Sequence, residues 1–121
     1  MDQRVLTIVR LIQKDMSRPL TLKEMAQAVS LSSSHLRALF KADTGMTPAQ
    51  YQKKLRLSEA QRLLETTFLN IREILVRVGI NDESHFIRDF KRAYGSTPIR
   101  YRATTSKEQV SSSEQLARKR V

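Results

Sequence analysis

The second half of this 121-residue chain repeats its first half. A shift of fifty positions aligns residues 35–51 with residues 85–101 and gives seven identities over seventeen positions. The identical pairs are His35 and His85, Phe40 and Phe90, Lys41 and Lys91, Gly45 and Gly95, Thr47 and Thr97, Pro48 and Pro98, and Tyr51 and Tyr101. Upstream of the histidines the shift becomes forty-nine, as in the pair Leu20 and Leu69, so one residue is inserted in the second copy. We therefore expect two copies of one small unit, and whatever one copy binds the other can bind beside it.

Each copy has the punctuation of a helix-turn-helix. Thr21 precedes Glu24 by three residues, which is a capping box that predicts a helix reaching about Val29. A short polar turn follows, and the next helix is predicted over 33–44, where Gly45 suits the left-handed position that ends a helix. The corresponding features of the second copy are Asn70, Glu73, Val78, residues 82–94 and Gly95.

Apolar spacing and proline predict the remaining helices. An apolar stripe predicts a first helix over 3–15. Thr47 and Pro48 form an N-cap followed by proline at the first helical position, and they start a helix of about eighteen residues that joins the two copies. The same pair at 97–98 starts a helix whose pattern ends within one or two turns, and the polar residues from Ala103 predict a disordered tail.

The predicted fold class is therefore all-α, with two helix-turn-helix subdomains joined by a long linker helix. The predicted domains are residues 1–46 for the first subdomain, residues 47–66 for the linker helix, residues 67–102 for the second subdomain and residues 103–121 for a polar tail. Neither subdomain is large enough to be expected to be stable alone.

The net charge indicates a polyanionic partner. Twenty-two Lys and Arg against twelve Asp and Glu give +10 and a pI near 10.5, which favours nucleic acid or an anionic membrane surface. No apolar run approaches the roughly 18 residues of a membrane span, and charges in the amino-terminal segment interrupt any signal-peptide core. The absence of cysteine excludes a disulfide framework and a cysteine-based metal site. We expect a soluble cytoplasmic protein with no membrane partner.

The candidates for DNA contact are the residues of each second helix that the core does not use. In helix-turn-helix proteins this helix lies in the major groove with its first residues at base edges. Spacings of three, four and seven give Ser34, Arg37, Ala38 and Lys41 in the first copy, and Ser84, Ile87, Arg88 and Lys91 in the second. Arg37 and Arg88 are the best base readers because a guanidinium bonds guanine O6 and N7 together, whereas Ala38 or Ile87 can contact a thymine methyl. A lone helix of this kind would more often be a solvated face, but the duplicated turn and the basic charge favour DNA.

Lysines are expected to contact phosphate rather than bases. A flexible ammonium carries little sequence information, which assigns Lys41 and Lys91 to the DNA backbone. For Lys53, Lys54 and Arg56, on the linker helix, solvent and phosphate are equally good interpretations.

Acidic residues and histidines leave further alternatives. Glu83 is either part of the helix start or an acceptor for cytosine N4, and Asp89, which stands where the first copy has Leu39, is expected to be exposed or salt-bridged. His35 and His85 lie in separate copies without a second ligand at helical spacing, so neither is predicted to bind metal. No nucleophile arrangement or phosphate-binding loop stands out, and neither enzyme activity nor a cofactor is expected.

At these residues the chain resembles the DNA-binding domain of the AraC/XylS family of bacterial transcription regulators. The resemblance covers about residues 5–102 and is strongest over 71–102. The motifs that carry it are Ile-Arg-Glu-Ile, Val-Gly-Ile-Asn-Asp-Glu-Ser-His-Phe, Phe-Lys-Arg-Ala-Tyr-Gly and Thr-Pro-Ile-Arg-Tyr-Arg. It implies seven helices, a recognition helix from each subdomain in adjacent major-groove segments of double-stranded DNA, and an activator that also contacts RNA polymerase.

The resemblance also implies which residues touch DNA. Its base-edge positions are Ser34, Arg37, Ala38, Glu83, Ser84, His85, Ile87 and Arg88. The phosphate contacts expected beside them are Ser33, Lys41, Lys53, Lys54 and Lys91. Small stand-alone members of the family carry tryptophan where Ser34 stands, so their target sequence does not transfer to this chain. Because the two rows differ, a single chain is expected to bind an asymmetric site as a monomer.

Many family members carry a ligand-sensing or dimerisation domain before the DNA-binding domain, and this sequence contains none. The chain is therefore expected to be either a regulator controlled by its abundance or a domain of a longer protein. Two other functions fit the charge: a helical module that binds an acidic protein, and a nucleoid-type DNA binder without sequence preference.

Overall fold

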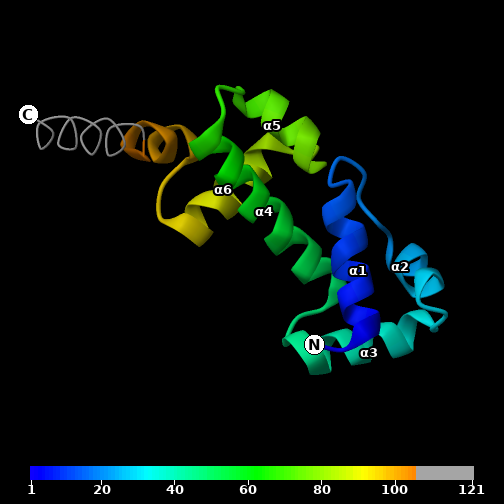
Figure 1. Ribbon diagram of the computed structural model, residues 1–121. Helices are drawn as coiled ribbons and strands as arrows, with labels where there is room; N and C mark the ends of the chain where they lie inside the picture. The colour runs from blue at the N-terminus through cyan, green and yellow to red at the C-terminus, as the bar shows by residue number, and fades with distance from the viewer. Residues whose placement is uncertain (106–121) are drawn as a thin grey trace, which may run out of the picture.

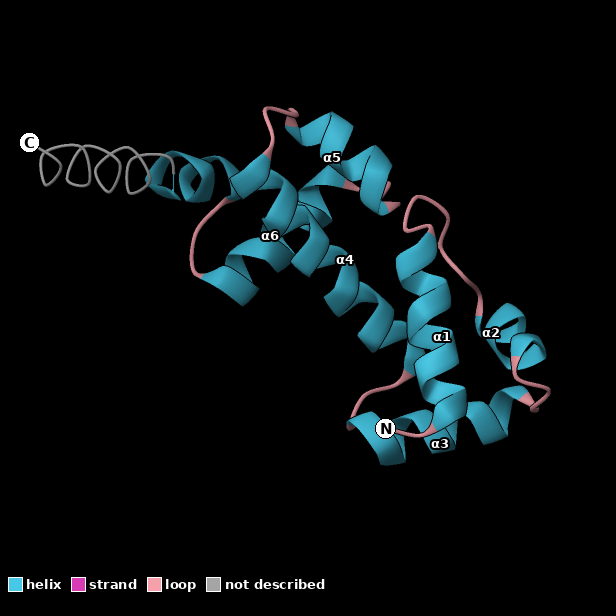
Figure 2. Ribbon diagram, in the orientation of Figure 1, coloured by secondary structure: helices cyan, strands magenta, loops and turns pink. Residues whose placement is uncertain are grey.

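The computed structural model describes residues 1–105, and this part of the chain consists of helices joined by turns, without a strand (Figures 1 and 2). The helices are α1 (Gln3–Lys14), α2 (Leu22–Ala28), α3 (Ser33–Thr44), α4 (Pro48–Thr66), α5 (Ile71–Val78) and α6 (Glu83–Tyr94). A seventh helix begins at Pro98 and includes residues through Thr105. The predicted all-α fold with seven helices is confirmed.

Side-chain caps start the helices at the expected positions. Thr47 and Asn70 each form a complete capping box with the residue three positions later. Thr21 forms only half of the predicted box, because its hydroxyl accepts the Glu24 N–H at 3.1 Å while the Glu24 carboxylate pairs with Arg18 at 3.0 Å. The box prediction for α2 was therefore wrong in that second hydrogen bond.

Glycines end α3 and α6 as predicted. Gly45 follows α3 with φ of 79°, and Gly95 follows α6 with φ of 84°, both in the left-handed region. The predicted start of the tail differs from the structure, because residues 103–105 continue the seventh helix. Residues 106–121, the rest of that predicted tail, lie outside the described residues.

Two apolar clusters form the core. The first contains Val5, Ile8, Val9, Ile12, Met25, Ala26, Leu36 and Phe40 from α1, α2 and α3. The second contains Leu57, Ala60, Leu63, Leu64, Ile74, Leu75, Val78, Phe86 and Phe90 from α4, α5 and α6. The amino-terminal part of α4 packs Tyr51 and Leu55 against the first cluster, whereas its remaining turns belong to the second. This helix therefore runs from one group of helices to the other (Figure 1).

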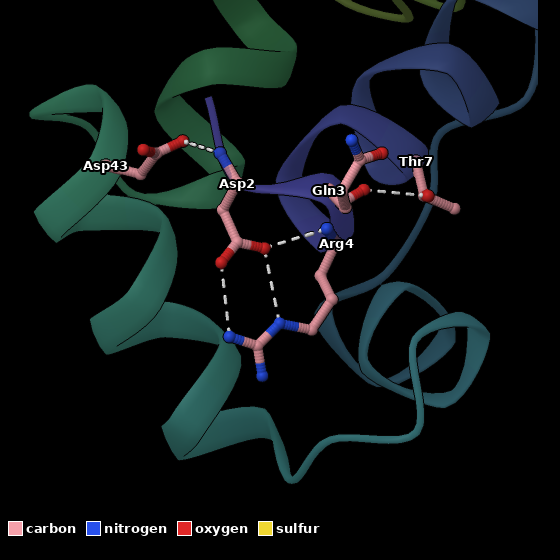
Figure 3. A network of polar contacts seen from close by, with 5 residues as sticks. All are labelled: Asp2, Gln3, Arg4, Thr7 and Asp43. Atoms are coloured by element: carbon pink, nitrogen blue, oxygen red, sulfur yellow. Dashed lines mark hydrogen bonds and ion pairs between the residues drawn. The ribbon is translucent and has the colours of Figure 1, made fainter.

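We call the helices around the first cluster the first unit and those around the second cluster the second unit. Within the first unit, the start of α1 is held against the end of α3 (Figure 3). The Asp2 backbone N–H donates to the Asp43 carboxylate at 3.1 Å, and the Asp2 carboxylate caps α1 by accepting the Arg4 N–H at 2.8 Å. The Arg4 guanidinium also pairs with this carboxylate at 3.2 Å and lowers the pKa of Asp2.

Equivalent positions, 52 and 102, each carry a polar side chain that hydrogen-bonds to backbone groups earlier in the chain. Gln52 lies on α4, and Arg102 lies on the seventh helix. In the first unit the buried Gln52 amide accepts the Leu20 N–H at 2.9 Å and donates to the Leu20 carbonyl at 3.0 Å. In the second unit Arg102 donates to the Leu69 carbonyl at 2.5 Å and to the Leu64 carbonyl at 3.1 Å. The Leu64 carbonyl is one of those that the end of α4 leaves without a helical partner.

The turn of the second unit lies directly against the first unit. Gly79 has φ of 70°, and a Cβ placed on it would lie 2.3 Å from the Met16 carbonyl oxygen and 3.0 Å from that of Ser17. Only a residue without a side chain permits this approach of two backbones. The glycine therefore joins the turn before α6 to the loop between α1 and α2.

Candidate nucleic-acid interface

The helix α3, predicted to be the first recognition helix, separates its core face from its predicted DNA face. Leu36 and Phe40 are buried, whereas Ser34, Arg37 and Ala38 are exposed. The Ser32 hydroxyl accepts the His35 N–H at 3.1 Å and begins the helix. The predicted base-edge row therefore lies on the first two turns of α3, on the face opposite the core.

The helix α6, predicted to be the second recognition helix, has the same arrangement. Phe86 and Phe90 are buried. The predicted base-edge residues of this helix are all exposed: Glu83, Ser84, His85, Ile87 and Arg88. Both predicted rows thus occupy accessible faces at the amino-terminal ends of equivalent helices, one in each unit.

Asp82 organises the start of α6 and was not among the predicted site residues. Its carboxylate accepts the His85 backbone N–H at 3.0 Å and lies 2.9 Å from His85 Nδ1. These contacts lower the pKa of Asp82, chiefly through the backbone hydrogen bond. His85 is therefore held at the helix start, which orients the edge of its ring. Its position three residues after an N-cap aspartate is the sequence signal that predicts this contact.

Within the described part of the chain, the two arginines predicted to read bases have no acidic partner. No ion pair within residues 1–105 involves Arg37 or Arg88. Both side chains are exposed, so their guanidinium groups keep all five donors available to an external acceptor. This is the chemistry that bidentate recognition of guanine requires.

The predicted phosphate-contacting residues are in different environments. Lys41 and Lys91 are exposed at equivalent positions late in α3 and α6, and Ser33 is half-buried at the start of α3. Lys54 is exposed, with its ammonium 5.9 Å from the centroid of the Tyr51 ring. Lys53 differs from the others, because its ammonium is engaged by a carboxylate on α6.

That carboxylate belongs to Asp89, for which a salt bridge was one of the two expectations. Lys53 Nζ lies 2.9 Å from Asp89 Oδ2, and the Asp89 side chain is only 17% exposed. Beside this pair, Arg56 is half-buried and donates to Gln52 Oε1 at 3.3 Å. Burial lowers the pKa of the Arg56 guanidinium, and its Nε has no hydrogen-bond partner among the described residues.

A cleft of about 330 Å³ lies between the two units at this point. Its walls come from the loop before α2, from α4 and from the turn and first half of α6, and include Pro19, Lys53, Arg56, Asn81, Asp82, His85 and Asp89. Its lining includes both basic side chains, Lys53 and Arg56, and acidic ones, Asp82 and Asp89. In residues 1–105 no group of three or more acidic or histidine side chains is placed to hold a metal ion. No helix of this part has the length and apolarity to cross a membrane.

Comparison with known proteins gives the family of this fold. A helix-turn-helix domain family matches residues 25–104. The transcriptional activator RhaR of Enterobacter sp. (strain 638) is 31% identical over 100 residues, which are 83% of this chain and 36% of that protein. The chain thus spans about a third of the length of the curated relatives it matches.

Two solved structures share the architecture. An AraC-type transcriptional regulator from Chromobacterium violaceum superposes with a TM-score of 0.79 at 29% identity, covering 84% of this chain and 91% of the other. The DNA-binding domain of the global transcriptional factor AdpA, solved in complex with a target DNA, has a TM-score of 0.79 at 26% identity and covers 85% and 93%. With its two helix-turn-helix units and the long helix between them, this chain belongs to the AraC/XylS-type family of DNA-binding domains.

Proposed function

We propose that this chain binds double-stranded DNA sequence-specifically and regulates transcription, with α3 and α6 entering two adjacent major-groove segments. The observation that carries the proposal is the pair of exposed rows at the amino-terminal ends of equivalent helices. In helix-turn-helix proteins this part of the second helix meets base edges. Membership of the AraC/XylS-type family supports the same conclusion, and the AdpA domain of similar fold is bound to DNA in its structure.

Each row has a distinct chemistry for base recognition. Ser34, Arg37 and Ala38 offer a hydroxyl, a guanidinium and a methyl group to the first segment. The second segment meets Glu83, Ser84, His85, Ile87 and Arg88, which add a carboxylate acceptor and a larger apolar surface. Because these sets differ, the preferred site is asymmetric, with one block for each helix.

Backbone contacts supply affinity and register. We assign Ser33, Lys41, Lys54 and Lys91 to phosphates, because no carboxylate within residues 1–105 holds their polar groups. The net charge of +10 favours association with the DNA polyanion. Lys53 is excluded from this set because it pairs with Asp89.

The two predicted recognition helices also bear on the oligomeric state and on the cellular role. One chain carries both recognition helices, so it binds as a monomer and needs no palindrome. We propose that it acts in the cytoplasm on the bacterial chromosome. Because most of the family activates transcription, we propose an activator that contacts RNA polymerase. Its residues bind DNA and do not catalyse a reaction.

The test is selection of bound duplexes from a random DNA pool, followed by titration of the selected duplex and a scrambled control at two salt concentrations. We expect one asymmetric motif with two blocks about one helical turn apart, bound roughly 10³-fold more tightly than the control. The variants Lys41→Gln and Lys91→Gln should weaken both duplexes alike and each reduce the salt slope by about one. Lys14→Gln, at the far end of α1, is the matched control and should leave both affinities unchanged.

Other results would contradict the proposal in distinguishable ways. Binding without an enriched motif would indicate a nucleoid-type binder. A strict palindrome bound by two chains would contradict the monomeric reader. No binding to any duplex would favour the acidic protein partner.

A further inference from the structure

The ion pair between Lys53 and Asp89 connects the linker helix to the second recognition helix. Lys53 lies in the second turn of α4, and Asp89 lies in the middle of α6, thirty-six positions later. The Asp89 side chain is 17% exposed, whereas that of Lys53 is 60% exposed. A carboxylate this far removed from water needs a partner in the folded protein, and Lys53 supplies one at 2.9 Å.

The residue before Lys53 holds the opposite unit. Gln52 is 8% exposed and forms both of its amide hydrogen bonds with the backbone of Leu20, just before α2. Consecutive side chains of α4 therefore bind a segment of the first unit and the recognition helix of the second. A third contact lies nearby, where Gly79 touches the Met16 carbonyl across the same junction.

The ion pair lies at a point of α6 where a small tilt of the helix would displace its base-edge residues. Phe86 and Phe90 fix one side of this helix in the core, and Asp89 fixes a second side. Asp89 lies five residues, or about 7.5 Å along the axis, from the base-edge residue Ser84. A tilt of about 10° around this point would move the helix start by about 1 Å, enough to lose well-aligned hydrogen bonds to bases.

We propose that the Lys53–Asp89 ion pair is a positioning contact that fixes the direction of α6 relative to α3, and with it the spacing between the two DNA blocks that the chain accepts. The inference rests on the proposed function for its effect on DNA. Its effect on the protein alone, a fixed distance between the two recognition helices, is independent of that function. Lys53 then acts through Asp89 and does not contact phosphate.

The first measurement uses the protein without DNA. The sequence contains no cysteine, so Ala42→Cys and Ala93→Cys introduce unique spin-label sites on exposed positions of α3 and α6. Pulsed electron–electron distance measurements should give one narrow distribution for this labelled background. Adding Lys53→Gln or Asp89→Asn should broaden or shift the distribution, and the charge swap Lys53→Asp with Asp89→Lys should restore it. Lys54→Gln, on the neighbouring exposed lysine, should leave it unchanged.

In the second measurement, the unlabelled chain and its Lys53→Gln, Asp89→Asn and charge-swap variants are titrated with three duplexes. These carry the two selected blocks at the preferred spacing, one base pair closer and one base pair further apart. The unmodified chain should lose about tenfold in affinity for either altered spacing, and the single variants about threefold or less. The charge swap should recover the discrimination, and circular dichroism melting confirms that each variant is folded.

The outcomes separate this inference from the proposed function. An unchanged distance distribution in both single variants would overturn the positioning role, whatever the chain binds. A phosphate contact by Lys53 predicts a different pattern: Lys53→Gln weakens all duplexes equally, Asp89→Asn strengthens them, and the swap gives no rescue. If the distances respond as expected but no duplex is preferred, the positioning of the helices stands and the proposed DNA reader fails.

Discussion

The first unit ends α2 with Ser30 in a left-handed conformation, φ of 57°, whereas the second unit has Gly79 at the equivalent position. The first turn thus holds an exposed side chain in this conformation. The second turn meets Met16, and a Cβ there would overlap the carbonyl oxygen. The equivalent position therefore carries an exposed serine in one copy and lies at the junction between units in the other.

The two units also differ in the aromatic packing of their cores. Phe40 in the first unit has one aromatic neighbour, Tyr51, with ring centroids 5.3 Å apart. Phe90 in the second unit lies within 6 Å of three aromatic rings, those of Phe86, Tyr94 and Tyr101. The core of the second unit thus contains more aromatic contacts than that of the first.

The largest difference should appear when the equivalent core phenylalanines are removed. Phe90→Ala should lower the free energy of unfolding by about 4 kcal/mol or more, because it leaves a cavity and breaks three aromatic contacts. Phe40→Ala should cost about 3 kcal/mol. Urea unfolding followed by circular dichroism measures both. An equal or larger loss for Phe40→Ala would contradict the comparison.

An intermediate effect is expected at the two turns. Gly79→Ala should cost about 3 kcal/mol, because it combines a left-handed alanine with overlap against the Met16 carbonyl. Ser30→Gly should change stability by less than about 1 kcal/mol, since relief of the left-handed serine offsets the added chain entropy of glycine. Thermal melting of the two variants compares them directly. If Gly79→Ala melts like the unmodified chain, the close approach of the units is absent in solution.

The smallest difference concerns pH and the two helix starts. Ser32 caps α3 and does not titrate, whereas Asp82 caps α6 and has a pKa held below its ordinary value of 3.8. A lowered carboxyl pKa contributes stability above the unfolded-state pKa that is lost as pH falls through the folded-state value. In acid, the His85 amide should therefore lose hydrogen-exchange protection before the His35 amide does. The substitution Asp82→Ser should abolish the difference, and parallel titration of both amides in the unmodified chain would argue against it.

Much of this fold was predictable because its signals are local. Thr47-Pro48, Asn70 with Glu73, and the glycine at the end of each recognition helix depend on residues a few positions apart. The exposed rows were likewise predictable, since burial of Phe40 leaves a defined opposite face on α3. The half-formed box at Thr21 differed because Glu24 binds Arg18 instead of the backbone.

The contacts between units were not predictable from local pattern. Lys53 and Asp89 meet only because α4 and α6 cross where they do, and a phosphate contact was an equally good interpretation of the lysine alone. The Gly79 contact with Met16 also depends on the arrangement of two loops far apart in sequence. The tail predicted from Ala103 on its polar composition overlaps the seventh helix at residues 103–105. Composition alone does not indicate the hydrogen bonds between the Tyr101 hydroxyl and the side chains of Gln61 and Glu65, which hold the seventh helix on α4.

The central claim is that the two units read different DNA blocks, and the most direct test compares the motifs selected by Arg37→Ala and Arg88→Ala from a random duplex pool. Each variant should lose sequence preference in one block only, at a cost of about 1–3 kcal/mol for the original site, while Arg10→Ala on α1 selects the unchanged motif. Loss of the same block in both variants, or an unchanged motif in both, would contradict a reader with one recognition helix in each unit.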